Sequence, residues 1–275
     1  MENWKRNTTL FLLGQTISLF GSSLVQYAIT WYITLHTQSG VMMTIAIISG
    51  FLPTFFLSPF AGVWADRYNR KFLLVGADSM IAFATLILAI LFLLGYEAIW
   101  LLFVMSAVRA VGSGIQQPAI GAMLPQLVPE DKLTKVNGTN SSLQSIVMLV
   151  SPMVSAPLLA QVPLSVIFFI DVVTAVIGVS ILLWFVRVPV HAKAKAQQTV
   201  SYLSDLVEGL KYIRRHDFVL AFCLFNAAFL ILAAPACFLT PLQVTRTFGD
   251  EVWRLSAIEV SFFAGMLLGG GLIAI

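Results

Sequence analysis

Three ionisable side chains inside long apolar runs of the sequence are candidates for transport chemistry: Asp78, Arg109 and Asp171; a fourth, Glu259, lies close to one end of the last run. A charge near the centre of a bilayer costs about 2.5–3.5 kcal/mol on insertion scales, so such residues often lie on a path for protons or substrate. Arg109 stands near the middle of its run and needs an anionic partner, a water-filled cavity or backbone carbonyls. Asp78 and Asp171 stand nearer the ends of theirs, where partial hydration is expected. We predict that all three lie on a proton or transport path; a structural polar contact is the alternative for each.

Uncharged polar residues recur on one face of the predicted helices. Gln15, Ser18, Ser22 and Gln26 are spaced three, four and four residues apart, which places them on one side of a helix. Ser and Gln often simply hydrogen-bond a neighbouring helix, but a series of this length favours a water-lined cavity. The predicted cavity-lining residues are Gln15, Ser18, Ser22, Gln26, Gln116, Gln144 and Asn226.

A short charged segment, 62–71, separates the apolar runs 41–65 and 72–94. It is too charged to lie in lipid and too short to be a domain. We therefore predict a tight turn at a membrane face. The residues of interest in it are Gly62, Asp66, Arg67, Arg70 and Lys71.

The composition requires a bilayer to position these residues. Charged residues make up 11% of the 275-residue chain, against about 25% in soluble domains, and 59% of the residues are hydrophobic. Each membrane span needs roughly 20 apolar residues. The apolar runs are continuous and lack the alternation of barrel strands, so the spans are predicted to be helices. The predicted fold class is an all-α polytopic membrane protein.

Eight apolar segments are predicted to cross the membrane, at about 9–35, 41–65, 72–94, 98–121, 137–162, 165–187, 218–244 and 256–275. The first is too long for the apolar part of a signal peptide and no small-x-small cleavage site follows it, so it is expected to remain as a span. The last is still apolar where the sequence stops, without the polar flank that usually anchors a membrane helix. We expect a C-terminally truncated chain.

The distribution of cations predicts the orientation. Of the 16 Lys and Arg residues, thirteen fall on the side of the N-terminus, two (Arg246 and Arg254) on the opposite side, and one, Arg109, within a span. Because cytoplasmic loops carry the excess of Lys and Arg, the N-terminus is predicted to be cytoplasmic. The expected location is the cell membrane, most simply a bacterial plasma membrane.

One long polar stretch divides the chain. We predict a six-helix N-terminal bundle over 1–188, a cytoplasmic linker over 189–217 and the start of a second bundle over 218–275. Within the linker, Leu203, Leu206, Leu210 and Ile213 recur at helical spacing. This pattern fits an amphipathic helix at the membrane surface, with a solvated connector as the alternative.

The sequence offers little for other kinds of chemistry. It has no Gly-x-x-x-x-Gly-Lys run that would indicate an ATP motor or an ATP-binding subunit, and its histidines are scattered rather than clustered as metal ligands. No nucleophile–base pair is apparent, so we predict no catalytic residue, no metal, no cofactor and no enzymatic activity. The cations are dispersed over loops, which argues against nucleic-acid binding.

Two patterns carry a family resemblance. The spacing Gly62-x-x-x-Asp66-Arg67-x-x-Arg70-Lys71 resembles the signature loop between helices 2 and 3 of the major facilitator superfamily. Arg109-x-x-Gly112-x-Gly114 resembles that superfamily's Arg-containing motif in helix 4.

A narrower resemblance is to macrolide-efflux-type drug:proton antiporters. It rests on Asp205-x-x-x-Gly209-Leu210-x-Tyr212-Ile213 and on Leu239-Thr240-Pro241-Leu242. One pattern departs from it: many antiporters carry Gly-x-x-x-Gly-Pro-x-x-Gly-Gly in helix 5, and here the stretch 147–156 keeps Pro152 but none of the four glycines. The departure weakens the case for antiport and leaves the fold unaffected.

The resemblance implies two six-helix halves related by a pseudo-two-fold axis, with helices 1, 2, 4 and 5 lining a central cavity. It also implies that Asp66, surrounded by Arg67, Arg70 and Lys71, binds the end of a second-half helix and acts as a conformational gate. The expected function is alternating-access, proton-coupled efflux of an amphipathic drug such as a macrolide. Its partners would be that substrate, protons and the lipid bilayer. The alternatives are a nutrient uptake transporter of the same fold, or a non-functional remnant or membrane scaffold.

Overall fold

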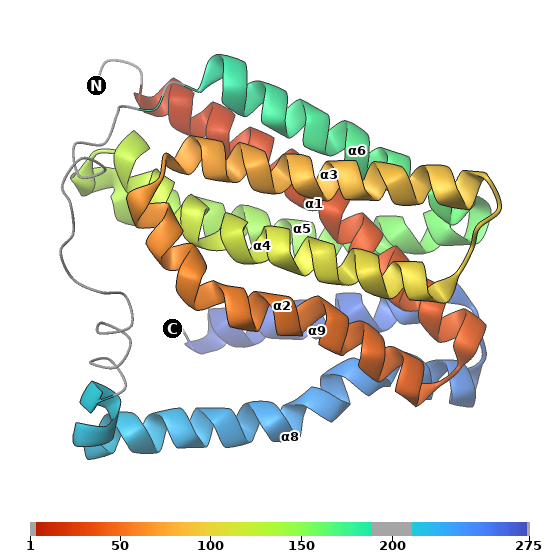
Figure 1. The fold of residues 1–275 in the computed structure, drawn as a ribbon. Helices are drawn as coiled ribbons and strands as arrows, with labels where there is room; N and C mark the ends of the chain where they lie inside the picture. The colour runs from red at the N-terminus through yellow and green to blue at the C-terminus, as the bar shows by residue number, and fades with distance from the viewer. Residues whose placement is uncertain (1–3, 187, 189–210, 274–275) are drawn as a thin grey trace.

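A computed structural model describes residues 4–186, 188 and 211–273, with side chains for all of these except 66, 236–237 and 267–273. The described residues are helical, with no strand among them, and the helices run back and forth between two ends (Figure 1). The elements are α1 (Trp4–Thr37), α2 (Gly40–Arg67), α3 (Arg70–Leu93), α4 (Ile99–Leu127), η1 (Glu130–Lys132), α5 (Leu133–Gln161), α6 (Leu164–Ser180), the π-helical turn η2 (Ile181–Phe185), α8 (Asp217–Phe248) and α9 (Val252–Ile273). Most of the predicted amphipathic linker helix lies outside the described residues.

Seven of the described helical stretches are long and apolar enough to cross a membrane. They match the first seven predicted spans, and α9 occupies the eighth predicted segment. The main differences are at helix ends. The predicted span 98–121 continues to Leu127 as α4, through Pro118 and Pro125, and ends just before Pro129. Proline is tolerated inside membrane helices because neighbouring groups satisfy the freed carbonyls.

The predicted turn over 62–71 is wrong in extent. Residues up to Arg67 belong to α2, and α3 begins at Arg70, so the turn itself is only Tyr68 and Asn69. The Asn69 side chain accepts a hydrogen bond of 3.0 Å from the Lys71 backbone N–H and so caps α3. The charged residues therefore sit on two helix ends, which fixes them more firmly than a loop would.

The bundle has two ends, which we call the basic end and the far end. The basic end carries the Tyr68–Asn69 turn with its neighbouring cations, and the far end carries the Gln38–Ser39 and 249–251 turns. The first six helices pack as one bundle, with α1 contacting both α5 and α6 and α4 contacting both α2 and α3.

Glycines set the close approach of α1 and α6. A Cβ on Gly178 would lie 2.8 Å from the carbonyl oxygen of Gly14, and one on Gly21 would lie 1.9 Å from Thr174 Oγ1. Neither distance is compatible with a side chain. Small residues of this kind let membrane helices approach backbone to backbone.

The bundle interior is layered. One apolar cluster, including Leu24, Leu88 and Phe168, fills the half toward the far end. A second cluster, including Phe11, Leu74 and Met123, fills the half toward the basic end. Between them, α1, α3, α4 and α6 contribute a layer of polar side chains. Apolar packing above and below isolates this polar layer from the ends of the bundle.

The last two helices, α8 and α9, touch the bundle mainly near the far end. Residues 221–232 of α8 are all exposed, whereas Leu242 and Thr245, near its other end, are buried. Helix α9 packs against α5, and Leu255 forms a buried cluster with Trp31 and Ala156. In Figure 1, α8 lies away from α2 near the basic end and converges with it at the far end.

Candidate functional site

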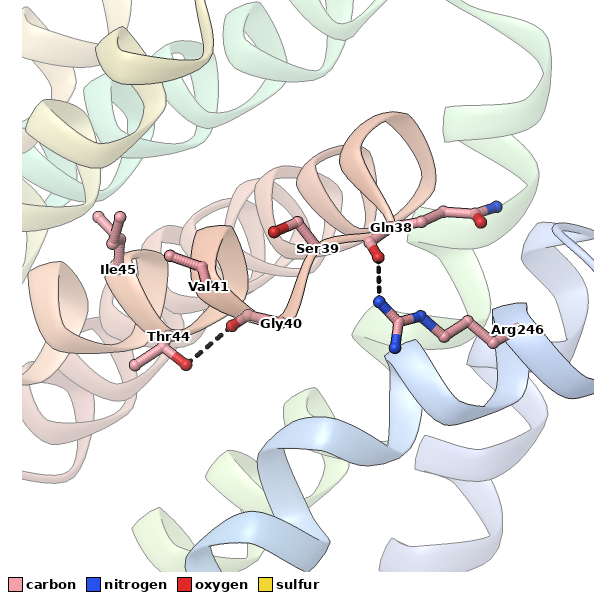
Figure 2. Close-up of a pocket in the computed structure, with 7 residues that line it drawn as sticks. All are labelled: Gln38, Ser39, Gly40, Val41, Thr44, Ile45 and Arg246. Atoms are coloured by element: carbon pink, nitrogen blue, oxygen red, sulfur yellow. Dashed lines mark hydrogen bonds between the residues drawn. The ribbon is translucent and has the colours of Figure 1, made fainter.

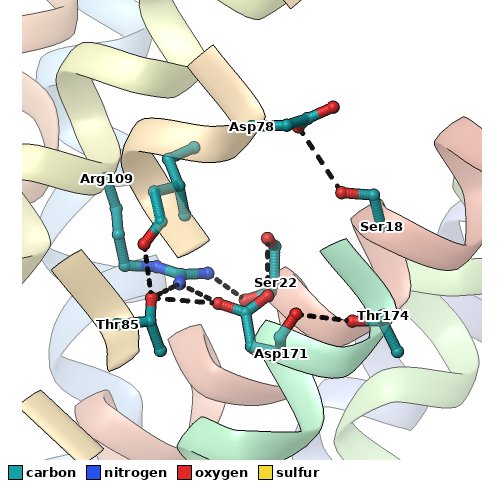
Figure 3. Close-up of polar contacts among 8 residues, drawn as sticks. Ser18, Ser22, Asp78, Thr85, Arg109, Asp171 and Thr174 are labelled. Atoms are coloured by element: carbon teal, nitrogen blue, oxygen red, sulfur yellow. Dashed lines mark hydrogen bonds and ion pairs between the residues drawn. The ribbon is translucent and has the colours of Figure 1, made fainter. Parts of the chain in front are cut away.

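Arg109 is the hub of the polar layer (Figure 3). Its Nη1 lies 2.5 Å from Asp171 Oδ2 and 3.2 Å from Thr85 Oγ1, and its Nη2 donates to the carbonyl oxygen of Ser22 at 2.7 Å. The guanidinium thus joins α4 to α6, α3 and α1. Of the three kinds of partner expected for Arg109, the structure provides an anion and a carbonyl.

Asp171 is surrounded by donors. Besides the Arg109 guanidinium, Ser22 Oγ donates to Asp171 Oδ1 at 3.0 Å, and Thr85 Oγ1 lies 3.2 Å from Oδ2. The residue has 0% of its surface exposed. The expected partial hydration of Asp171 is therefore wrong, because α1, α3 and α4 close over it. The Asp171 carboxylate is therefore paired with a cation and has two hydroxyl groups beside it.

Asp78 has different surroundings on the same layer. Its Oδ1 accepts a hydrogen bond of 2.7 Å from Gln116 Nε2 and lies 3.4 Å from Ser18 Oγ. Gln116 Nε2 is also 3.5 Å from Gln15 Oε1. The other oxygen, Oδ2, is buried and has no hydrogen-bond partner in the described part of the chain. Only 3% of Asp78 is exposed, so its expected partial hydration is also wrong.

The predicted cavity-lining residues separate into groups. Gln15 and Ser18 are buried, and Ser22, Gln116 and Gln144 are half-buried. Gln26 is exposed on α1, and Asn226 is exposed on α8, away from the polar layer. The series on α1 therefore does not form one open stripe here, because its first members turn inward toward the carboxyl groups of α3 and α6.

Two cations of the predicted gate bind helix ends. Arg70 Nε donates to the carbonyl of Ala65 at 2.8 Å and its Nη1 to the carbonyl of Ala122 at 2.6 Å, which links α2 to α4. Lys71 Nζ lies 2.9 Å from both the Leu183 and the Val186 carbonyl oxygens. A cation at this position stabilises the carboxyl end of a helix.

The other gate residues have fewer described contacts. Arg67 is exposed, and Gly62 is half-buried with open space where a Cβ would point. The side chain of Asp66 lies outside the described residues.

Sequence reasoning missed several contacts. Thr85 stands seven residues after Asp78, on the same helix face, and that spacing was the available signal. No local pattern indicated the contacts of α8 and α9 with the bundle. At the far end, Arg246 Nη2 donates to the Gln38 carbonyl at 2.6 Å, and Ser256 Oγ donates to the Pro152 carbonyl at 3.0 Å.

A surface cavity of about 650 Å³ lies beside the Gln38–Arg246 contact (Figure 2). The Gln38–Ser39 turn and the start of α2 form most of its wall, and Arg246 reaches into it from α8. A second groove, of about 670 Å³, runs along α2 and includes Phe51 and Phe55. The Phe51 ring meets that of Phe238 on α8 edge-on, with centroids 5.5 Å apart.

These features define a class: a multi-pass helical membrane protein whose bundle encloses an ion pair and a further acid between two apolar layers. The chain belongs to the Major Facilitator Superfamily, whose family model matches residues 11–275. The family consists of transporters and not of enzymes.

Three named proteins are similar in sequence to most of this chain. Macrolide efflux protein A of Streptococcus pyogenes is 34% identical over 274 residues, covering 100% of this chain and 67% of that protein. Macrolide efflux protein A of Enterococcus faecalis is 33% identical over 237 residues, covering 86% of this chain and 73% of that protein. Multidrug resistance protein MdtG of Citrobacter koseri is 27% identical over 218 residues, covering 76% of this chain and 51% of that protein.

The fold is also that of a solved transporter. A bacterial homologue of the human lysosomal transporter Spinster, crystallised in an inward-facing and unoccupied conformation, superposes with a TM-score of 0.66. The two share 13% identity, and the match covers 95% of this chain and 59% of the other. This similarity supports the fold alone.

Proposed function

We propose that the chain acts in proton-coupled export of an amphipathic drug of the macrolide type, by alternating access. The observation that carries the proposal is the 34% identity to a macrolide efflux protein along 100% of this chain. The buried acids of the polar layer supply groups that can couple transport to protons, as ionisable residues inside membranes commonly do.

The orientation follows from charge. With the excess of Lys and Arg facing the cytoplasm, the basic end lies inside the cell and the N-terminus is cytoplasmic. The contacts between α8 or α9 and the bundle then lie toward the outer face, at Gln38, Pro152 and Leu255. We infer an arrangement that is closed to the outside and open toward the cytoplasm, which suits loading of a drug for export.

The α2 groove is the proposed contact surface for the drug. It is lined by aliphatic and aromatic side chains, with Thr54 and Ser58 as its polar members. Binding sites for small molecules are mostly apolar with a few polar groups that orient the ligand. A sugar or peptide would require more polar groups in the groove, so export of an apolar compound is favoured over nutrient uptake.

The gate of the proposed cycle is the segment around Asp66. Arg70 and Lys71, at the start of α3, bind backbone carbonyls of α2, α4 and η2, so a change at Asp66 would be transmitted to several helices at once. Arg109 and Asp171 hold α1, α3, α4 and α6 together at mid-depth. We infer that these four helices stay joined at the Arg109 level while the contacts of the bundle with α8 and α9 open and close.

Drug accumulation in cells tests the function. Cells lacking their own efflux pumps would express the chain and receive radiolabelled erythromycin, a macrolide, with and without a protonophore. We expect lower accumulation than in empty-vector cells, restored by the protonophore and by Asp66→Asn. Equal accumulation with and without the chain, or a decrease that survives the protonophore, would contradict the proposal.

A further inference from the structure

The two aspartates of the polar layer have opposite electrostatic surroundings. Asp171 faces the Arg109 guanidinium at 2.5 Å and accepts hydrogen bonds on both of its oxygens. Asp78 faces the Gln116 amide and the Ser18 hydroxyl, both at its Oδ1, and its Oδ2 has no hydrogen-bond partner among the described residues. Both carboxyl groups are at least nine-tenths buried. Their roles in transport should therefore differ.

Among the residues that the structure describes, the charged ones on the helices that surround Asp78 provide no cation that pairs with its carboxylate. At the level of the polar layer they are Arg109 of α4 and Asp171 of α6, which pair with each other. The remaining charged or titratable groups on these helices lie toward the bundle ends: Lys5, Arg6, Asp66 and Arg67 toward the basic end, and Tyr27, Tyr32 and His36 toward the far end. An isolated buried charge is strongly unfavourable, whereas a neutral carboxylic acid is tolerated.

We infer that Asp78 is the proton-binding site of the transport cycle, and that Asp171 is a positioning residue that holds Arg109. This inference rests on the proposed proton-coupled export. In the loading step a hydronium ion breaks one of its O–H bonds and becomes water, and its proton forms an O–H bond with Asp78 Oδ2, which leaves a neutral acid. In the release step that bond breaks, the proton returns to water, and the carboxylate remains.

Helix α4 gives this titration a mechanical consequence. Gln116 and Arg109 are seven residues apart on one face of α4, so the same helix contacts both acids. A hydrogen bond to a charged acceptor is roughly twice as strong as one to a neutral acceptor. Protonation of Asp78 therefore weakens its bond to Gln116, while the bond between Arg109 and Asp171 is unchanged. In the protonated state, α4 would therefore be held less tightly at Gln116 and would stay held at Arg109.

Infrared spectroscopy of the purified chain in lipid nanodiscs tests the assignment directly. The readout is the carbonyl-stretch band of a protonated carboxylic acid, followed as pH is raised. We expect a band that is missing in Asp78→Asn, shifted in frequency in Asp78→Glu, and retained in the surface control Glu97→Gln. Should Asp78→Asn fail to fold, Ser18→Ala is the second variant, since loss of a neighbouring hydroxyl shifts the same band.

Two results would overturn the assignment: a band that is unchanged in Asp78→Asn and in Ser18→Ala, or no band at any pH at which the chain is folded. Loss of the band on adding Na⁺ at constant pH would also overturn it, since the site would then bind a metal cation.

A transport measurement distinguishes failure of this inference from failure of the proposed function. Asp78→Asn should abolish erythromycin export driven by a pH gradient but keep exchange of labelled for unlabelled drug. If this variant still exports drug and the protonophore blocks the export, the proposed function stands and the Asp78 assignment fails. If the wild-type chain does not export drug but shows the Asp78 band, the function fails and the assignment stands.

Discussion

Arg246 of α8 donates a hydrogen bond of 2.6 Å to the backbone carbonyl of Gln38, at the turn between α1 and α2. Gln38 has a positive φ of 46°, a conformation that is uncommon for residues other than glycine. Such backbone conformations persist where surrounding contacts hold them. In the proposed orientation this contact closes the outer face, and it must break when the transporter opens outward.

We predict that Arg246→Ala loosens the outer contact. Ser256, whose hydroxyl bonds the Pro152 carbonyl, is the reporter: Ser256→Cys should react about two- to fivefold faster with a membrane-impermeant maleimide when Arg246→Ala is added, as loss of one surface hydrogen bond implies. The control is Arg254→Ala, because Arg254 pairs with Glu251 on its own turn at 2.9 Å. If Ser256→Cys reacts equally fast with and without Arg246→Ala, the contact between Arg246 and Gln38 does not close the outer face.

Breaking the Arg109–Asp171 pair should lower the free energy of unfolding more than neutralising Asp78 does. Asp171→Asn leaves a buried guanidinium without its anion, a change that costs about 3–5 kcal/mol in comparable cases. Asp78→Asn removes no charge partner and should cost less than half as much. Unfolding of the purified variants in mixed detergent micelles gives both values. Equal losses for the two substitutions would contradict the assigned roles.

A double replacement sharpens that comparison. Arg109→Met combined with Asp171→Leu removes both charges and fills the space with apolar groups, so it should recover most of the stability lost in Asp171→Asn. The same double variant should not transport drug. A double variant that is as unstable as Asp171→Asn would show that hydrogen bonds, rather than charge, hold the layer.

The contact of α1 with α6 should tolerate no added methyl group. Gly178→Ala brings a Cβ to 2.8 Å from the Gly14 carbonyl oxygen and should destabilise the chain by about 1–3 kcal/mol through overpacking. Gly76→Ala on α3 has open space and is the matched control, expected to be neutral or slightly stabilising. Thermal unfolding temperatures of the two variants, measured in the same detergent, decide between these outcomes.

Lys71 should protect η2, the π-helical turn that follows α6. Lys71→Met removes the donor to the Leu183 and Val186 carbonyls, so backbone amides in 181–186 should exchange with deuterium about two- to fivefold faster. Arg67→Met, at an exposed neighbour, should leave that exchange unchanged. Faster exchange in both variants, or in neither, would remove Lys71 from this role.

The layout of the helices could be predicted from the sequence because apolar runs and their flanking charges are local signals. The same reasoning placed Arg109 in the middle of α4 and required a partner for it. It could not choose that partner, because the choice depends on how α1, α3 and α6 are arranged around α4. The difference between Asp78 and Asp171 was hidden for the same reason: both stand among apolar neighbours along the chain.

Depth estimated from a helix end was a poor guide to hydration. Asp171 lies within two turns of the start of α6, yet neighbouring helices enclose it completely. For the ten-residue charged segment 62–71, the error was to predict too long a turn. Its charges suggested a loop, but capping by Asn69 and the contacts of Arg70 and Lys71 let both helices continue almost to the turn.

Flux across a lipid membrane tests the central claim most directly. The purified chain would be reconstituted into liposomes with an acidic interior, and entry of labelled erythromycin would be measured against protein-free liposomes of the same composition, which show passive trapping alone. Proton-coupled antiport predicts faster drug entry accompanied by proton exit, and loss of the excess when an ionophore removes the pH gradient. Drug entry equal to that of protein-free liposomes, or an excess that persists without the gradient, would contradict the account.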